Sequence, residues 1–295
     1  MNIDGVFSGG GIKGLALVGA YQAIEEQGLK FKRLAGTSAG AIIAGFIAAG
    51  YKSDNLINIM DEIDLPELLD KNRLLSSVPI IRWLMVYRKL GLYKGDALEQ
   101  WLEEKLRVRG VYTFADLPPG ALRVIASDLT NGRLMVLPDD LDKYGVPKET
   151  FPVARAIRMS ASLPYFFEPV RLKSLDGLNL VVDGGVLSNF PMWLFDKENT
   201  KKVRPVLGIK LSPNIQERPK NKIHNAIGMY DALFQTMKDA HDSRYISRKH
   251  ETNIIFIPTE GVLTTEFELT VEKKRELIEY GYNKAKDFLR SWSYG

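Results

Sequence analysis

Two glycine-rich motifs near the amino terminus hold the residues whose types and spacing are best suited to chemistry. Residues 36–40, Gly-Thr-Ser-Ala-Gly, have the pattern of a nucleophile elbow, in which small residues allow a sharp turn that exposes the hydroxyl of Ser38. Residues 9–14, Gly-Gly-Gly-Ile-Lys-Gly, allow backbone amides to approach a phosphate or an oxyanion closely. Together the two motifs would suit acyl transfer to a serine. Taken alone, the first is also compatible with a serine N-cap, and the second with a tight turn that binds nothing.

A serine hydroxyl is a weak nucleophile until a base accepts its proton, and Asp183 is the first candidate for that base. It directly follows the apolar run at residues 180–182 and precedes Gly184 and Gly185. Catalytic side chains of parallel sheets gather at the carboxyl ends of strands, which is where both Ser38 and Asp183 would lie. An isolated Asp-Gly pair is more often a turn. The assignment of Asp183 as a base therefore depends on the presence of the other two motifs.

The alternative base is a histidine, and the chain has only three of them, at positions 224, 241 and 250. The order Ser38, Asp183, His241 formally satisfies the triad of α/β-hydrolases. Helical spacing from Ile223 places His241 on the same apolar face as Phe234, so it is the strongest of the three candidates. A triad histidine usually sits on a loop after a strand, which favours a core or capping role for His241. The other two histidines are expected at the surface.

Hydrophobic periodicity predicts alternating strands and helices. Strands are predicted at residues 3–8, 31–35, 123–127, 133–137, 179–182, 203–211 and 253–257. Helices are predicted at residues 12–27, from residue 39 onward, and near 54–69, 95–107, 152–160, 223–248 and 271–292. The opening order of strand, glycine turn, helix, strand, glycine turn and helix is typical of a βαβ crossover. The predicted fold class is therefore α/β, with a largely parallel central sheet flanked by helices.

Length and composition narrow the class of protein. The chain has 295 residues, 45% of them hydrophobic, which suits a globular protein with a large core. No linker or repeat divides it, so residues 1–295 are expected to form a single domain. The net charge of +4 is small and mixed, so no nucleic-acid partner is expected. The longest apolar run, Ala39–Gly50, is shorter than the ~20 residues of a transmembrane segment, and no signal peptide is visible, so a cytoplasmic location is expected.

The spacing of residues 9–14 also fits the G-x-G-x-x-G fingerprint of dinucleotide-binding proteins. That fingerprint requires an acidic residue about 20 positions later, at the end of the second strand, where this chain has residues 32–34, Lys-Arg-Leu. An arginine there could suit a 2′-phosphate, so this alternative stays open, as does a non-catalytic lipid-binding module. A Walker loop is excluded because neither Ser nor Thr follows Lys13.

The three motifs, in this order, resemble the signature blocks of the patatin-like phospholipases. Residues 159–170 are similar to the block that precedes the catalytic aspartate in that family, and together the blocks cover roughly residues 4–196. The resemblance implies a three-layer α/β fold, in which residues 197–295 add helices and strands to the same domain. It also implies a Ser–Asp dyad, with Ser38 as nucleophile and Asp183 as general base. The amides implied for the oxyanion hole are those of Gly9, Gly10 and Gly11, and the motif glycines are Gly14, Gly36, Gly40, Gly184 and Gly185.

The resemblance further implies a lipid or phospholipid ester as substrate, with no cofactor and no metal. The acidic residues Asp61, Glu62 and Asp64 are better explained as a solvated helix end than as a cation site. Residues 76–93 carry aromatic and aliphatic side chains punctuated by Arg and Lys, which is typical of a lid or interfacial segment in peripheral contact with a membrane. A buried helix with snorkelling cations explains this composition equally well, and both interpretations stay open.

Overall fold

The computed structural model describes residues 1–70, 86–196, 203–212, 223–224, 226–245, 251–259, 265 and 269–293. The strands are β1 (Asn2–Phe7), β2 (Lys30–Thr37), β3 (Gly91–Tyr93), β4 (Leu122–Asp128), β5 (Arg133–Leu137), β6 (Tyr165–Phe167), β7 (Val170–Ser174), β8 (Gly177–Asp183), β9 (Val206–Lys210) and β10 (Ile254–Phe256). The α-helices are α1 (Leu15–Glu26), α2 (Ala39–Ala48), α3 (Ser53–Glu62), α5 (Asp96–Arg107), α6 (Val153–Ser160), α7 (Ala226–Tyr245) and α9 (Val271–Ser291). The 3-10 helices are η1 (Gly11–Gly14), η2 (Leu65–Leu68), η3 (Phe114–Asp116), η4 (Leu141–Tyr144), η5 (Gly184–Val186) and η6 (Met192–Phe195). Among these described helices, none is both long and apolar enough to span a membrane.

The main sheet has the strand order β10-β9-β1-β2-β4-β8-β7, and β5 pairs with β4 off this path. Neighbours from β10 to β4 run parallel, which confirms the predicted largely parallel sheet. The exceptions are β5 and β8, which run antiparallel to β4, and β7, which runs antiparallel to β8. Periodicity does not predict β3 and β6, because each is only three residues long. β7 is also absent from the predicted strands, although it alternates apolar and charged residues as a half-buried edge strand does.

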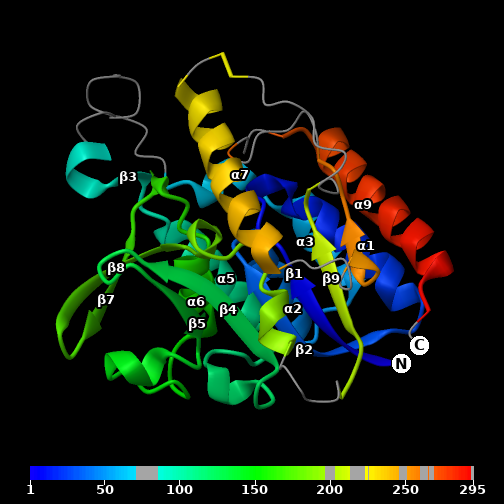
Figure 1. Ribbon diagram of the computed structural model, residues 1–295, viewed down its shortest axis with the longest axis horizontal. Coiled ribbons are helices and arrows are strands. Elements are labelled where there is room, and N and C mark those ends of the chain that lie inside the picture. The colour runs from blue at the N-terminus through cyan, green and yellow to red at the C-terminus, as the bar shows by residue number, and fades with distance from the viewer. Residues whose placement is uncertain are drawn as a thin grey trace.

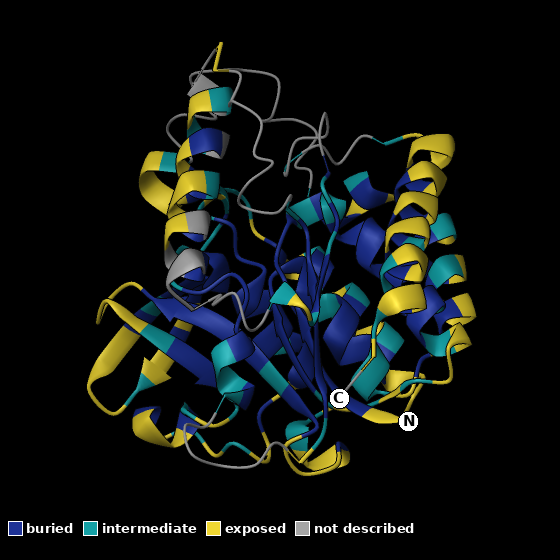
Figure 2. Ribbon diagram, turned by 45° about the vertical axis from the view of Figure 1, so that its right-hand side comes forward, coloured by how far each residue is buried: buried dark blue, intermediate teal, exposed yellow. Residues whose placement is uncertain are grey.

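Helices cover both faces of the main sheet, as Figure 1 shows. On one face, α1, α2 and α6 bury strand side chains such as Ile3 and Phe7, and α3, α5 and α9 pack against those helices. The opposite face includes Val6 and Ala35 and is covered by the segment 184–195, with η5 and η6, and by α7. Figure 2 shows the result, a buried sheet inside a shell of helices whose outer sides are exposed. The predicted three-layer α/β arrangement is confirmed.

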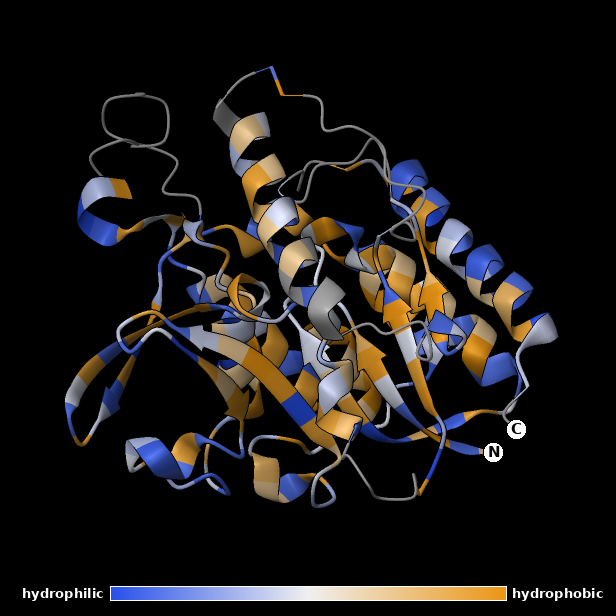
Figure 3. Cartoon of the chain, viewed as in Figure 1, coloured by the Kyte–Doolittle hydropathy of each residue, from blue (hydrophilic) through white to orange (hydrophobic). Residues whose placement is uncertain are grey.

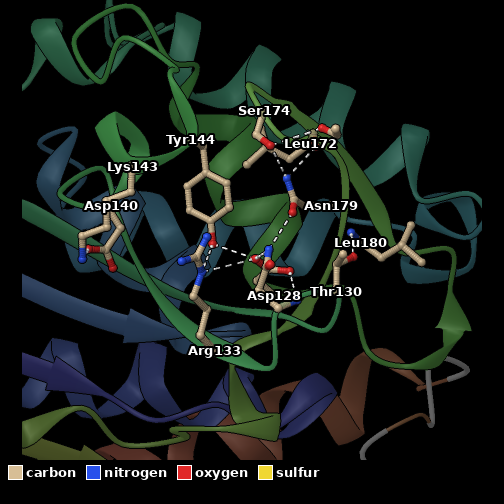
Figure 4. Close-up of polar contacts among 12 residues, drawn as sticks. Asp128, Thr130, Arg133, Asp140, Lys143, Tyr144, Leu172, Ser174, Asn179 and Leu180 are labelled. Atoms are coloured by element: carbon tan, nitrogen blue, oxygen red, sulfur yellow. Dashed lines mark hydrogen bonds and ion pairs between the residues drawn. The ribbon is translucent and has the colours of Figure 1, made fainter.

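A buried polar network fixes the end of β4 against β8 (Figure 4). Oδ2 of Asp128, the last residue of β4, accepts hydrogen bonds from Nδ2 of Asn131 at 2.7 Å and from the Tyr144 hydroxyl at 2.8 Å. Asn131 Nδ2 also donates to Oδ1 of Asn179 in β8 at 2.7 Å. Burial alone would raise the pKa of Asp128, but these hydrogen bonds and the charge of Arg133 together hold that pKa below its usual value. The network therefore helps to set the register in which β8 meets β4.

Two glycines let α1 and α9 pack with their backbones in contact. A Cβ at Gly281 would overlap the carbonyl oxygen of Ala16, and a Cβ at Gly19 would overlap that of Ile278. Alanine is the better helix former by ~1 kcal/mol, but overpacking costs ~1–3 kcal/mol and the clash here is with rigid backbone. We therefore expect Gly281→Ala to lower the free energy of unfolding in urea by about 1–2 kcal/mol.

Glu279 lies on the exposed side of the same helix, and Glu279→Ala is the matched control. Its free energy of unfolding should stay within about 0.5 kcal/mol of the wild type. An increase in stability for Gly281→Ala would show that helix propensity outweighs the contact between α1 and α9.

Candidate active site

Ser38 sits at the sharp turn between β2 and α2, as the elbow pattern predicts. Its backbone lies at φ 54° and ψ −124°, a conformation that L-residues adopt only under strain. Small neighbours make the turn possible: a Cβ at Gly36 would overlap the carbonyl oxygen of Gly40, and a Cβ at Gly40 would overlap that of Phe7. The Ser38 amide donates to Oγ of Ser160 at 2.8 Å, which holds the turn against the end of α6.

Asp183 is the last residue of β8 and is only 1% exposed. Its Oδ1 accepts the amide of Gly185 at 2.7 Å. Its Oδ2 is buried and has no hydrogen-bond partner among the described residues, although the Ser38 hydroxyl is close enough to lower the pKa of Asp183. A buried carboxylate oxygen without a donor is costly, and a proton received from Ser38 would satisfy it.

The direction of β8 differs from the parallel arrangement expected around Asp183. Because β8 runs antiparallel to β4, its carboxyl end points toward the amino ends of the parallel strands. Asp183 nevertheless pairs with Ala126, since β8 contacts only the last three residues of β4. Thr37 pairs with Ile125, one residue earlier on β4, so Ser38 and Asp183 reach the same level of the sheet on either side of that strand. Register, and not parallel direction, therefore brings the two residues to one cavity.

The surroundings of Asp183 give it the basicity of a proton acceptor. Burial raises the pKa of Asp183 to about 6, because the charged carboxylate loses its water. The Ser38 hydroxyl, the Gly185 amide and the positive charge of Lys238 each oppose that rise. Lys238, from α7, is 3% exposed and lines the same cavity. Asp183 is therefore ionised at neutral pH but more basic than an ordinary carboxylate.

The dyad predicted from the sequence would make the rate of ester hydrolysis depend on the protonation of Asp183. For a short soluble ester, kcat/KM should fall below about pH 6, because protonated Asp183 cannot accept the Ser38 proton. Lys238→Met should move this acidic limb to higher pH, since losing the positive charge lets burial raise the pKa of Asp183 further. Lys286→Met removes a charge from the exposed side of α9 and should leave the limb in place.

Temperature distinguishes a carboxyl group from an imidazole in this pH profile. Histidine titrates in the same range as the raised pKa of Asp183, so the position of the limb alone does not identify the group. Carboxyl ionisation is nearly athermal, and we expect the limb to stay in place between two temperatures. A large shift with temperature would contradict the assignment and point to a histidine.

The glycine loop at residues 9–14 borders the cavity, but its first three glycines differ in what they can do. The Gly9 amide donates to the carbonyl oxygen of Asn189 at 3.2 Å, so of the three predicted oxyanion donors it is the one whose amide already has a partner. A Cβ at Gly9 would lie 2.5 Å from Oδ1 of Asn189, so this position needs glycine for close packing. Gly10 and Gly11 line the cavity at the start of η1, and their amides are not used by any backbone hydrogen bond of the described residues.

Ser38 and Asp183 border a cavity of about 900 Å³, measured together with its mouth. The walls come mainly from α2, α3, η2, α5, β6 and α7, and most of the lining side chains are apolar. Representative lining residues are Ile42, Ile63, Leu68, Trp101, Phe166 and Phe234. Because apolar walls favour hydrocarbon over water, this cavity suits a substrate with a long hydrocarbon chain whose reacting group lies near Ser38.

Several polar residues that hold the site in place are absent from the sequence prediction. The Ser160 hydroxyl accepts the elbow amide, and the Ser162 carbonyl oxygen accepts the amide of Asp183 at 2.9 Å. Thr37 Oγ1 donates to the carbonyl oxygen of Ser188 at 3.0 Å. The two side-chain bonds join residues that are 122 and 151 positions apart, so no local pattern could have identified them.

The histidine and lid predictions fall partly on residues that are not described. His224 is exposed, as predicted. His241 belongs to α7, but its side chain lies outside the described residues, and so does the whole of His250. Of the predicted lid segment, residues 76–85 also lie outside them, whereas residues 86–93 form a helical turn and β3, with Tyr87 82% exposed.

In the described part of the chain, the residues needed for a dinucleotide or metal site do not come together. β2 continues to Thr37, so Arg33 lies in mid-strand instead of at the strand end where a 2′-phosphate would need it. Arg33 Nε donates to Oδ2 of buried Asp4 at 3.1 Å, and Arg204 Nε donates to the other carboxylate oxygen at 3.0 Å. Within the same described ranges, no three His, Asp or Glu side chains are grouped as a metal site requires.

The part of the chain that holds the glycine loop, the elbow and the aspartate motif is matched by a known family. Residues 5–196 fit the family description patatin-like phospholipase. The chain belongs to the patatin-like phospholipase family. This match confirms the resemblance drawn from the motifs, and it indicates lipid acyl hydrolysis in general terms without naming a substrate.

Relatives and solved structures agree with this patatin-like assignment. The uncharacterised protein YqhO of Bacillus subtilis is 55% identical over 294 residues, which cover 100% of each chain. Protein 463L of Invertebrate iridescent virus 6, named a probable lipid hydrolase, is 26% identical over 212 residues, covering 67% of this chain and 64% of that protein. The crystal structure of VipD from Legionella pneumophila superimposes with a TM-score of 0.59 at 19% identity, covering 98% of this chain and 67% of that one. At that identity the likeness concerns the patatin-like fold alone.

Proposed function

We propose that this protein is a serine hydrolase that cleaves carboxylic ester bonds of lipids, with Ser38 as nucleophile and Asp183 as general base. The observation that carries the proposal is the meeting of three features at one apolar cavity. These features are a serine on a strained turn, a buried carboxylate whose Oδ2 has no hydrogen-bond partner among the described residues, and a glycine loop in which two amides make no backbone hydrogen bond within those residues. Family membership and the named lipid hydrolase among the relatives support the choice of a lipid substrate.

The proposed mechanism is a two-step acyl transfer. The Ser38 oxygen attacks the ester carbonyl carbon while its proton passes to Oδ2 of Asp183, and the negative charge that develops on the carbonyl oxygen is held by the amides of Gly10 and Gly11. Collapse of this intermediate expels the alcohol, which takes the proton from Asp183 and leaves an acyl-Ser38 ester. Water then attacks that ester and gives its proton to Asp183. The fatty acid leaves as the Ser38 oxygen regains the proton.

The general base and the oxyanion donors are each expected to make a large contribution to the reaction rate. General-base assistance is worth roughly 10²–10⁴-fold, and one oxyanion donor about 10²–10³-fold. The strained backbone at Ser38 supports the same assignment, because strain of this kind is found where a functional turn must be held open. Peripheral contact with a membrane through residues 76–93 is part of the proposal, as is one domain over residues 1–295, supported by an apolar core that runs from Ile3 to Leu289.

A fluorophosphonate probe tests the proposal directly, because it reacts with activated serines. The native protein should be labelled on the peptide that contains Ser38, as located by mass spectrometry, and the heat-denatured protein should not be labelled. The labelled enzyme should no longer release fatty acid from phosphatidylcholine vesicles or from a short soluble ester. Labelling at another serine, or full hydrolysis after stoichiometric labelling of Ser38, would contradict the proposal.

A further inference from the structure

The helix α7 buries two charged side chains beside apolar ones such as Phe234, and it exposes a row of apolar side chains. Its charged residues Lys238 and Asp242 are buried, with 3% and 2% of their surface exposed. Its apolar residues Met229 and Leu233 are 51% and 63% exposed, and Met237 continues the same row. Single exposed apolar residues are common on proteins, but a row of them on a helix whose buried side carries the charges requires an explanation.

Three contacts of the inner side fix the orientation of α7. Asp242 forms a buried ion pair with Lys210 of β9, and its Oδ1 accepts the amide of Phe190 at 3.0 Å. Near the other end of the helix, the Tyr230 hydroxyl donates to the carbonyl oxygen of Pro164 at 2.7 Å. The helix therefore cannot rotate to bury its outer row without breaking a buried ion pair.

The outer side of α7 is uncharged wherever it is described. At 100° per residue, the described exposed residues fall on one side of the helix, and these are Met229, Leu233, Thr236, Met237 and Ala240. The exposed and hydrophobic positions along α7 are visible in Figure 2 and Figure 3. Among the described side chains of this outer face, none carries a charge.

An exposed tyrosine lies beside α7, next to Tyr230. Tyr165 of β6 is 59% exposed, and its ring lies 6.2 Å from that of Tyr230, centroid to centroid. It has φ 61°, a left-handed conformation that is strained for an aromatic residue. The two residues that follow it, Phe166 and Phe167, line the cavity. The strained turn thus places one aromatic ring outside the protein and the next two inside the cavity.

We propose that the outer face of α7, defined here as Met229, Leu233 and Met237 together with Tyr165, docks on the surface of a phospholipid bilayer. This inference rests on the proposed lipid hydrolase function. The opposite side of the same helix lines the cavity through Phe234 and Lys238, so a surface that covers the outer face lies within about one helix diameter, ~10 Å, of the cavity.

The chemistry of the outer face favours a lipid surface over a protein partner. An uncharged helix face with an adjacent tyrosine matches a helix that lies in the plane of a membrane interface, where apolar side chains enter the acyl region and tyrosine sits near the headgroups. A bilayer also supplies the substrate proposed for the adjacent cavity. Because the described side chains of the outer face carry no charge, their binding to zwitterionic lipid should depend little on salt.

Vesicle binding by point variants tests the docking surface. Met229→Glu and Leu233→Glu, made separately, should each weaken co-sedimentation with phosphatidylcholine vesicles by ~10-fold or more, because a charged group would replace an apolar side chain that enters the bilayer on docking. The matched control is Leu175→Glu, on the tip of the β7–β8 hairpin, where Leu175 is 86% exposed. All binding is measured in a Ser38→Ala background so that the vesicles stay intact, and thermal melts confirm that each variant folds.

Comparing hydrolysis of vesicles with hydrolysis of a soluble ester distinguishes a loss of docking from damage to the cavity. With Ser38 present, Leu233→Glu should lower the hydrolysis rate on vesicles ~10-fold and leave the rate on a short soluble ester within about twofold. An equal loss on both substrates, or vesicle binding unchanged from wild type, would overturn the docking proposal. A third result would also overturn it: the wild type forms a dimer, and Leu233→Glu dissociates that dimer without changing vesicle binding. The outer face would then bind a second copy of this chain.

Failure of the hydrolase proposal has a different signature. If the wild-type protein hydrolyses no ester and yet binds vesicles through Leu233, the docking surface stands and the proposed catalysis falls. If it hydrolyses the soluble ester and Leu233→Glu changes nothing on vesicles, the catalysis stands and the docking surface falls.

Discussion

Ser38→Ala is expected to abolish ester hydrolysis, lowering kcat by about 10⁴-fold or more, because no other group can form the acyl-enzyme. The fold should be retained. The Ser38 side chain caps no helix, and alanine has the same Cβ in the same strained conformation. The measurement is the rate of release of p-nitrophenol from a short p-nitrophenyl ester, together with a thermal melt.

The strain at this position provides an internal check on that result. Glycine adopts φ 54° without penalty, so Ser38→Gly should be as inactive as Ser38→Ala but more stable to urea. Ser291→Ala, at the exposed C-terminal end of α9, is the control serine and should keep full activity. Hydrolysis above about one part in 10³ of wild type in Ser38→Ala would exclude the acyl-enzyme mechanism.

Asp183→Asn is expected to lower kcat/KM by about 10²–10⁴-fold, because the amide cannot accept the Ser38 proton. The size of the side chain and the acceptor for the Gly185 amide are retained, so the loss is attributable to the missing base. The pH profile of the residual activity should lack the acidic limb near pH 6 that the wild type shows. Initial rates across pH 4–9 on the short ester measure both effects.

Stability should change in the opposite sense to activity in this variant. Burial raises the pKa of Asp183 from 3.8 to about 6, so the folded state resists ionisation that the unfolded chain undergoes freely. The wild type therefore loses stability as pH rises from about 4 to about 6, by on the order of 2–3 kcal/mol, and this loss is fully present above pH 6. The asparagine side chain of the variant does not ionise, so urea unfolding should show the stability of Asp183→Asn, relative to wild type, rising across that window.

His241→Ala distinguishes the carboxylate base from the triad alternative. If Asp183 is the base, this variant keeps most of its activity, since the proton transfer then needs no imidazole. A folded His241→Ala protein that loses as much activity as Asp183→Asn would favour the triad. Retained activity in Asp183→Asn would contradict the dyad.

Local sequence signals predict most of the fold around the site. The glycine turns after β1 and β2 are predictable from a few adjacent residues. Close backbone approach excludes any side chain at positions such as Gly36 and Gly40, so the turn requires glycine there. Most helices and the parallel strands follow from hydrophobic periodicity and are found within a few residues of their predicted ends. The helix predicted near residues 54–69 is the exception, because α3 ends at Glu62 and the separate 3-10 helix η2 follows it. Short or edge elements such as β3, β6 and β7 escape this reasoning because too few residues carry the pattern.

The sequence identifies the candidate nucleophile and the candidate base, but it does not predict how the fold brings them together. The sequence places Ser38 and Asp183 at strand ends, and a parallel sheet would put both ends at one edge. The actual β8 runs the other way, and the two residues come together only because Asp183 pairs with Ala126 near the end of β4. Register is set by contacts such as the Asp128 network, which no local pattern encodes.

The sequence by itself therefore determined the family, the elbow and the glycine loop, because these depend on backbone constraints among neighbouring residues. Only the tertiary structure decided which amides of the loop are unused, since the Gly9 amide bonds to Asn189, a residue 180 positions away. It also decided the burial that raises the pKa of Asp183 and the outward direction of the apolar row on α7. These properties depend on which side of each element faces the core, and distant parts of the chain set that choice.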